Sequence, residues 1–481
     1  MPEAMPELEE QSTSYTTAED RSLPHAGALV FFDGALERLD VVRAVARAAL
    51  VHPELRHKPT RLPLAADVLA WSPDPLFRGS KQVQVVELDD VGDERALARA
   101  VARSWSRPLP ADRPPWEITL FSDRRGERST VLVKAHRALA EANGPAALAA
   151  TLLGTTRDAA PPRLPMPRSD RAGVLPTLLQ AATALADAGA RRSRAFASDV
   201  REMLRPGVAL TRTREVGRIL ESAGTLLSSP APETPWNGTL GPERTVAWLA
   251  LSRDVLRGIE EVFGGDWQDA WMTIVADALG RYLRSRGRST TGLTLLAYAP
   301  GEAPASPSSA AHTRDSRGGR MSDDAPRLLG LPVDEMSPAA RHAAVLKHRL
   351  DPLAVARGSG LEQLARVSQQ LPAPLQSLLG SLCYQAANTV LVAERAPREP
   401  LVLAEHRATA VVPLAALPWH VGLALAALDW HDDELVIGVT GDTALVPQIG
   451  EVVRALHDAY VEVAAAAGVP PVNPLRVRRA H

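Results

Sequence analysis

The stretch TVLVKAHRALAEANGPAALAATLL, residues 130–153, decides the fold expected for this chain. Its apolar run, residues 131–133, is typical of a buried strand, and a short polar crossing follows. Pro145 then opens an Ala/Leu-rich segment of helical composition. Proline suits a first helical position because its missing N–H has no intrahelical role there. The sequence therefore predicts a strand, a loop and a helix.

The loop in this stretch carries three candidate site residues. His136 and Arg137 directly follow the apolar run, and Glu141 lies within the polar crossing. Functional residues gather in loops positioned by a rigid scaffold, and the end of a buried strand is such a place. An ordinary fold also places polar turns there, so both interpretations stay open on these residues alone.

Length and composition set the class of protein. With 481 residues, the chain is too long for one typical core, so two to three domains are expected. Hydrophobic residues make up 45% and charged residues 23%, which is ordinary globular composition. The formal net charge of −2 gives no bulk attraction to nucleic acid or to an anionic membrane, so no nucleic-acid partner is expected.

Three further observations narrow the class of protein. The single cysteine, Cys383, excludes an intrachain disulfide and a cysteine-built zinc site, and a lone thiol is more often core packing than a nucleophile. The first twenty residues are acidic and polar, unlike a secretion signal. The sequence contains no uninterrupted run of eighteen or more apolar residues, so no membrane-spanning helix is predicted.

The chain on either side of the central stretch alternates between strand and helix patterns. Before it, strands are predicted at 28–32, 82–88 and 118–120, and amphipathic helices at 39–50 and 93–105. This mixture predicts a layered α/β domain. Prolines at 161, 162, 165 and 167 mark a linker after it. We predict a flexible tail over 1–21, an N-terminal domain over 22–157, a linker and helical connector over 158–235, and a C-terminal domain over 236–481.

The predicted C-terminal domain repeats the α/β texture. Ser252 is expected to cap a helix that begins at Arg253, because a serine hydroxyl can satisfy free N–H groups there. Residues 303–324 form a polar insertion rich in Pro, Ser, Gly and Arg. Strands are predicted at 245–251, 293–298, 389–393, 421–428 and 434–440, and helices at 266–284, 337–370 and 447–465.

Five segments resemble the bacterial wax ester synthase/acyl-CoA:diacylglycerol acyltransferase family. The family signature is a strand followed by His-His-x-x-x-Asp-Gly, and residues 136–142 here read His-Arg-Ala-Leu-Ala-Glu-Ala. Residues 113–117, Arg-Pro-Pro-Trp-Glu, are similar to the family's Arg-Pro-Leu-Trp-Glu. The other resembling segments are Trp236–Arg244 at the start of its second domain, Gln268-Asp269 at its Asn-Asp pair, and Gly441–Pro447 at its C-terminal Asp…Val-Pro-Asp segment.

The resemblance implies a fold and an activity. It implies two domains similar to chloramphenicol acetyltransferase, with a helical connector and a channel between them. It implies transfer of a fatty acyl group from acyl-CoA to a long-chain alcohol or diacylglycerol, with no cofactor beyond the acyl-CoA substrate and no metal. It also implies a cytoplasmic protein with possible peripheral contact to a membrane or lipid droplet. In the family, the second histidine of the signature is the general base, and the aspartate anchors the loop.

This chain departs from the signature at three positions. Arg137 replaces the second histidine, and a guanidinium has no free lone pair with which to accept a proton. Glu141 is one methylene longer than the aspartate, so a tight loop anchor would be displaced. Ala142 resists the positive φ that a glycine accepts, and this freedom can instead reside at Asn143-Gly144.

Three hypotheses follow. In the first, His136 acts as the base from the adjacent position, although neighbouring side chains at a strand end usually point to opposite faces. In the second, the channel persists without acyl transfer, and Arg137 holds a CoA phosphate or a carboxylate. In the third, His136 and Arg137 form a satisfied turn without a ligand.

Other residues have plainer interpretations. His420, His431 and the acidic run 432–434 invite a metal site, but their spacing matches no ligand pattern and suits a solvated turn. Trp267 and Trp271 lie four residues apart on a predicted helix, where core packing is more common than an acyl-binding site. In the connector, a solvated face is preferred over a lipid-binding one for its arginines, which are Arg191, Arg192, Arg194 and Arg201.

Overall fold

Strand β6 (Ser129–His136) lies inside a six-stranded sheet, and all of its residues are buried. Apolar, β-branched residues suit a strand that is covered on both faces. β6 pairs antiparallel with β1 on one side and β5 on the other. The order of this first sheet is β11-β12-β1-β6-β5-β4, and its other strands are β1 His25–Phe32, β4 Val83–Leu88, β5 Trp116–Asp123, β11 Val402–Leu403 and β12 His406–Leu414.

The computed structural model describes much of the chain outside the linker. The described residues are 25–62, 65–110, 112–123, 128–140, 144–154, 231–300, 327–334, 336–351, 387–397, 399–418, 420–431 and 434–470. They all belong to one compact unit. The predicted tail, the connector arginines, Cys383 and the polar insertion lie outside the described residues.

In the first half of the chain, helices form where the apolar residues recur at helical spacing. α2 (Arg38–Val51) buries one face and leaves the other to solvent, and α5 (Pro145–Leu153) packs between α2 and β1. The Asp93 side chain caps α3 (Glu94–Trp105) by accepting hydrogen bonds from two backbone N–H groups of its first turn. The remaining elements are a 3-10 turn Pro53–Arg56, a hairpin of β2 His57–Leu62 and β3 Ala65–Pro73, a 3-10 turn Gly79–Gln82, and α4 Arg137–Ala140.

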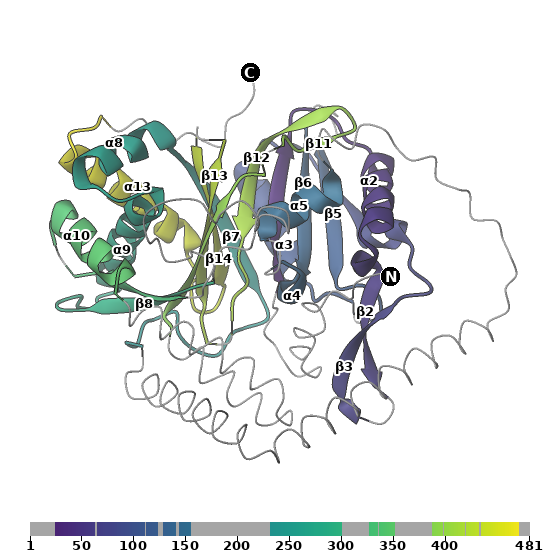
Figure 1. Cartoon of the computed structure of the whole chain (residues 1–481), viewed down its shortest axis with the longest axis horizontal. Coiled ribbons are helices and arrows are strands. Elements are labelled where there is room, and N and C mark those ends of the chain that lie inside the picture. Colours follow the sequence, from purple (N-terminus) through teal and green to yellow (C-terminus); the bar gives the residue numbers. More distant parts are fainter. Residues whose placement is uncertain are drawn as a thin grey trace, which may run out of the picture. The chain divides into compact units, whose positions relative to one another are not determined.

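Two strands of the first sheet come from the far end of the chain. β12 pairs antiparallel with β1, so that Leu29 lies opposite Val412. β11 pairs with β12 in turn. Figure 1 shows these light-green strands beside the purple and blue strands of the first sheet. The sequence did not predict β12, and the domain limits 22–157 and 236–481 stay predictions.

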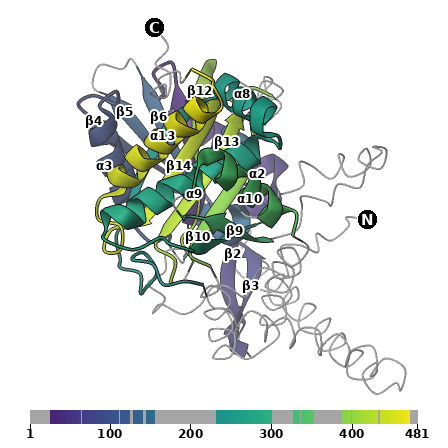
Figure 2. The ribbon, with the colours of Figure 1, turned by 90° about the vertical axis from the view of Figure 1, so that its left-hand side faces the viewer.

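The second sheet also has six strands, in the order β7-β14-β13-β10-β8-β9. Its strands are β7 Arg244–Ser252, β8 Thr294–Ala299, β9 Arg327–Pro332, β10 Thr389–Arg395, β13 Leu423–Trp430 and β14 Glu434–Asp442. Helices cover one face, and Figure 2 shows α9 and α13 crossing in front of the strands. These helices are α8 Arg253–Phe263, α9 Trp267–Ser285, α10 Pro338–Arg349 and α13 Ile449–Ala466.

The helix caps correct one expectation. Ser252 occupies the N-cap position of α8, as predicted, but its side chain makes no capping hydrogen bond. Asp266 supplies the stronger cap, because its carboxylate accepts from the N–H groups of Gln268 and Asp269 at the start of α9. Asp269 completes a reciprocal capping box with the backbone of Asp266.

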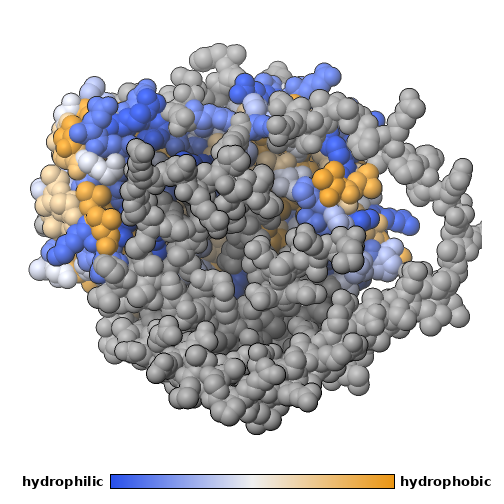
Figure 3. Space-filling model, viewed as in Figure 1, coloured by the Kyte–Doolittle hydropathy of each residue, from blue (hydrophilic) through white to orange (hydrophobic). Residues whose placement is uncertain are grey.

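The surface of the described residues is mainly polar on the face that Figure 3 shows, with separate apolar patches. Single exposed apolar side chains are normal on a folded protein. Large apolar residues that are exposed include Leu39, Leu50, Val51, Leu76, Val262 and Leu350. Among the described residues, no helix has the length and apolar character needed to cross a membrane.

Candidate active site

His136 is the last residue of β6, and its side chain is buried. Its backbone N–H donates to the carbonyl oxygen of Pro115 at 2.9 Å, which fixes the strand end. Side chains alternate along a strand, so His136 faces the same side of the sheet as Lys134. On that side, Lys134 reaches the C-terminal end of α3. The first residue of the signature therefore points to the α3 side of the sheet.

Lys134 forms a buried polar anchor below His136. Its Nζ lies 2.6 Å from Oε1 of Glu117 and donates to the carbonyl oxygens of Ser104 and Arg107, each at 2.8 Å. Burial lowers the pKa of Lys134, while the Glu117 carboxylate opposes that shift. Three partners around one ammonium group hold the end of α3 against the sheet.

His25, which sequence analysis missed, lies directly opposite His136 on β1. Its Nδ1 is 3.2 Å from the carbonyl oxygen of Trp105, and its ring meets the Trp105 ring edge to face. A carbonyl oxygen only accepts hydrogen bonds, so Nδ1 carries the proton and Nε2 keeps a lone pair. The strand predicted at 28–32 began too late to include His25, and no local pattern indicates which strand it faces.

Burial keeps both imidazoles neutral. It lowers the pKa of His25 well below its usual range, and the charge on Lys134 adds to the effect. Burial also lowers the pKa of His136 to about 3, with the charge on Arg137 contributing. A general base works best when its pKa lies near the working pH. His136 is therefore a poor acceptor for a hydroxyl proton at neutral pH.

Arg137 begins α4 and is partly buried. It stands between the buried strand end and the loop that leads to α5. Its guanidinium is a permanent cation and donates hydrogen bonds only. His136 and Arg137 thus lie at the end of the predicted strand, but the first part of the predicted loop is the short helix α4. Glu141 lies outside the described residues, and its anchoring role stays a prediction.

The loop ends at Gly144, whose φ of 77° is in the left-handed region. This agrees with the hypothesis that backbone freedom resides at Asn143-Gly144 in this chain. Pro145 occupies the first position of α5, as predicted. The next N–H group, that of Ala146, donates to Oε2 of Glu394 on β10 at 3.0 Å. A carboxylate from the second sheet therefore meets the end of this loop.

Two other signature segments, distant in sequence, meet in a buried ion pair. Nη1 of Arg244 lies 2.8 Å from Oδ2 of Asp442, and both side chains are almost fully buried. Asp442 also accepts from the backbone N–H of Gly241 at 2.8 Å. Oγ of Ser106, just after α3, accepts from the backbone N–H of Arg244 at 2.8 Å. The segments at 236–244 and 441–447 are thus held together by hydrogen bonds and an ion pair, next to the end of α3.

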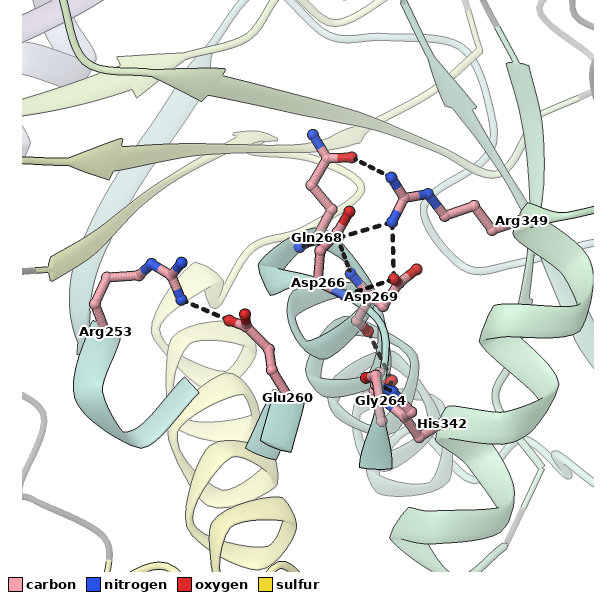
Figure 4. Close-up of polar contacts among 9 residues, drawn as sticks. Arg253, Glu260, Gly264, Asp266, Gln268, Asp269, His342 and Arg349 are labelled. Atoms are coloured by element: carbon pink, nitrogen blue, oxygen red, sulfur yellow. Dashed lines mark hydrogen bonds and ion pairs between the residues drawn. The ribbon is translucent and has the colours of Figure 1, made fainter. Parts of the chain in front are cut away.

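The Gln268-Asp269 pair belongs to an ionic cluster at the start of α9. Figure 4 shows Arg349 of α10 between Asp266, Gln268 and Asp269. The Arg349 guanidinium lies 2.7 Å from Asp266 Oδ1, 2.8 Å from Asp269 Oδ2 and 3.1 Å from Gln268 Oε1. Burial alone would lower the pKa of Arg349, but the hydrogen bonds to Asp266 and Asp269 outweigh it and raise this pKa above its usual value. Gln268 and Arg349 also line an open pocket with the apolar Trp271 and Met272.

The remaining candidate residues lie in turns or in the hydrophobic core. His420 and His431 have φ values of 65° and 53°, which are turn conformations, and Asp432-Asp433 lie outside the described residues. Within the described ranges, no group of three or more His, Cys, Asp or Glu is placed to hold a metal ion. Trp267 and Trp271 are buried in the core between the second sheet and its helices.

Comparison with known proteins decides the family. Residues 9–271 match the family model for the wax ester synthase/diacylglycerol acyltransferase catalytic domain. The chain belongs to this family. An inferred diacylglycerol O-acyltransferase of Mycobacterium tuberculosis is 26% identical over 425 residues, covering 85% of this chain and 79% of that protein. A probable diacylglycerol O-acyltransferase of the same species is 24% identical over 411 residues, covering 82% and 81%.

Solved structures share the fold. The wax ester synthase/diacylglycerol acyltransferase from Marinobacter aquaeolei VT8 superposes with a TM-score of 0.63 at 17% identity, covering 94% of this chain and 97% of that one. The first condensation domain of the CDA synthetase gives 0.53 at 16% identity, covering 94% and 93%. The predicted α/β fold of two chloramphenicol-acetyltransferase-like domains is confirmed. The helical connector and the channel stay predictions.

Proposed function

We propose that this protein is a wax ester synthase/diacylglycerol acyltransferase homologue whose acyl-transfer activity is impaired. Its substrates would be a fatty acyl-CoA and a long-chain alcohol or diacylglycerol, with no further cofactor. The observation that carries the proposal is Arg137 at the position of the family's base. General-base catalysis contributes about 10²- to 10⁴-fold to a rate, so its loss leaves a slow enzyme.

The surroundings of His136 support an impaired enzyme rather than one in which His136 replaces the base that is missing at position 137. His136 is the nearest alternative base, but it is buried beside Lys134, and its pKa is lowered to about 3. Removing a proton from an alcohol with so weak a base is strongly uphill. We therefore assign His136 to the packing of the strand end and expect little turnover through it.

A second candidate function is binding of acyl-CoA or lipid without catalysis. Arg137 favours this candidate because a partly buried guanidinium can make charge-assisted hydrogen bonds to a phosphate or carboxylate. In this case, the fold would keep its ligand but lose its chemistry. Under both candidates we expect a cytoplasmic protein that meets its water-insoluble ligands at a membrane or lipid-droplet surface.

A turnover assay separates these possibilities. Purified protein would receive labelled palmitoyl-CoA with either hexadecanol or diacylglycerol, beside the His136→Ala variant. We expect slow ester formation that persists in His136→Ala, since His136 is not the base. Loss of that turnover in the variant would contradict our assignment of His136. Absence of product with retained palmitoyl-CoA binding would replace the impaired enzyme by the binding protein.

A further inference from the structure

Glu394 connects the second sheet to the end of the signature loop. It lies on β10, and its Oε2 accepts a hydrogen bond from the backbone N–H of Ala146 at 3.0 Å. Leu391 of the same strand packs in the core beneath the helices of the second sheet. Because side chains alternate along a strand, Glu394 points to the opposite face. That face is turned towards the loop.

The N-cap residue of α5 makes no side-chain capping hydrogen bond. Its N-cap residue is Gly144, which has no side chain, and the first helical residue is Pro145, which has no N–H group. Ala146 therefore carries the first N–H of the helix, and such a group has no intrahelical partner. A carboxylate suits this place because the N-terminus of a helix carries partial positive charge. Glu394 supplies from a distant strand the cap that Gly144 cannot.

Gly144 leaves the space that Glu394 occupies. A Cβ atom built on Gly144 would lie 3.0 Å from Oε2 and 3.1 Å from Cδ of Glu394. The positive φ of Gly144 also disfavours any residue with a side chain. The carbonyl oxygen of Gly144 accepts the first intrahelical hydrogen bond, from Leu148, at 3.0 Å. The backbone conformation therefore requires glycine here, and the close approach of the Glu394 carboxylate adds to this preference.

The signature loop is thus held at its two ends by different sheets. At its beginning, the backbone N–H of His136 donates to the carbonyl oxygen of Pro115, which directly precedes β5 of the first sheet. At its end, Ala146 is bonded to Glu394 of the second sheet. We propose that Glu394 is a positioning residue, which fixes Gly144 and the first turn of α5 and couples this end of the loop to the second sheet. The catalytic part of this proposal rests on the proposed acyl-transfer function, whereas the structural part does not.

Amide hydrogen exchange in the full-length protein tests the structural part. In Glu394→Ala, the amide of Ala146 should exchange at least about tenfold faster, while amides of β13 keep their protection. Glu394→Gln keeps an acceptor oxygen without the charge, so its exchange should be intermediate. Glu261→Gln, on the exposed surface of α8, serves as the control and should match the wild type. An unchanged Ala146 amide in Glu394→Ala would overturn the proposal.

Turnover tests the positioning role separately. Glu394→Ala would be combined with Arg137→His, and its palmitoyl-CoA kinetics compared with those of Arg137→His alone. Displacement of the loop should lower kcat at least about tenfold with KM changed less than about twofold, and Glu394→Gln should restore part of it. Equal kcat values would overturn the positioning role. Should Arg137→His form no product, that result counts against the proposed function, and the exchange of Ala146 alone decides on Glu394.

Discussion

At the scale of single residues, position 137 separates binding from catalysis. A neutral histidine can take a proton from a hydroxyl group, whereas a guanidinium keeps its charge at any physiological pH. Electrostatic attraction to an acyl-CoA phosphate would survive this exchange, and proton transfer would not. The two properties can therefore be tested by one substitution.

Arg137→His should raise the rate of palmitoyl transfer to hexadecanol or diacylglycerol by about 10²-fold or more, because it restores a general base. Initial rates with labelled palmitoyl-CoA measure the effect. Arg43→His, on the exposed face of α2, is the matched control and should leave the rate unchanged. No gain in Arg137→His would mean that the loop has also departed from a productive geometry.

The buried His136 should make the protein sensitive to acid. Its pKa is about 3 in the folded state, against an ordinary value of 6.5. Between these values the unfolded chain binds a proton that the folded chain does not, so stability falls as pH falls. His136 should contribute a slope of about 1.4 kcal/mol per pH unit across this window.

Urea unfolding between pH 7 and pH 4 measures this slope. His136→Asn, which cannot titrate, should show a shallower loss of unfolding free energy than the wild type. Variant and wild type with the same slope would contradict the assignment of the lowered pKa to His136.

The site was predictable only as far as local pattern reaches. The apolar run and Pro145 predicted a loop that carries His136 and Arg137 between a strand and a helix. In the structure, His136 is the last residue of β6 and Arg137 is the first residue of the short helix α4, which was not predicted. His25 lies opposite His136 on a paired strand, and Glu394 reaches Ala146 from the second sheet. No spacing in the sequence indicates these contacts. The position of a residue along its own segment could be predicted, whereas its contacts with residues of distant segments could not.

At the scale of elements, long periodic segments were predicted well. The apolar spacing of α9 and the continuous apolar runs of β13 and β14 each agree with the structure to within a few residues. β12 was missed because it pairs with β1 at the other end of the chain. Its polar Arg407 and Thr409 interrupt the apolar pattern on its outer part. The hairpin of β2 and β3 and the edge strand β9 were missed as well.

Contact between β14 and β12 predicts a strict requirement for glycine. A Cβ on Gly438 of β14 would lie 1.8 Å from the carbonyl oxygen of Pro413 in β12, so the two strands would have to separate. Gly438→Ala should therefore lower the unfolding free energy by about 1–3 kcal/mol or more. Urea denaturation measures this loss.

The matched control is Gly450→Ala in α13, where a Cβ would meet nothing within 4 Å. Alanine is preferred over glycine in a helix, so this change should stabilise the protein by up to about 1 kcal/mol. Equal effects of the two substitutions would show that the close approach of β14 and β12 does not limit stability.

At the scale of the whole molecule, a buried ion pair joins two distant parts of the chain, and a hydrogen bond beside it joins a third. Arg244 at the start of β7 pairs with Asp442 at the end of β14, and Ser106 after α3 bonds to the Arg244 backbone. Removing one member of a buried pair leaves the other charge uncompensated. This cost exceeds what the intact pair itself contributes.

Asp442→Ala should therefore destabilise the protein by about 3–5 kcal/mol, seen as a lower urea midpoint. Asp254→Ala is the control, because Asp254 is exposed on α8, where it forms a surface ion pair with Arg257. Surface pairs contribute about 0–1 kcal/mol. A loss in Asp442→Ala as small as in the control would show that solvent reaches the Arg244 guanidinium.

The order of strands in the first sheet has a consequence for synthesis on the ribosome. β1 and β6 emerge early, but β12, which covers the other side of β1, ends only at Leu414. At about 5–20 residues per second, the nascent chain exposes this strand edge for roughly 15–60 s. An open edge invites pairing with other chains. Recombinant yield should therefore improve with slower translation initiation, which spaces the nascent chains, or with co-expressed ribosome-associated chaperones that shield the exposed edge.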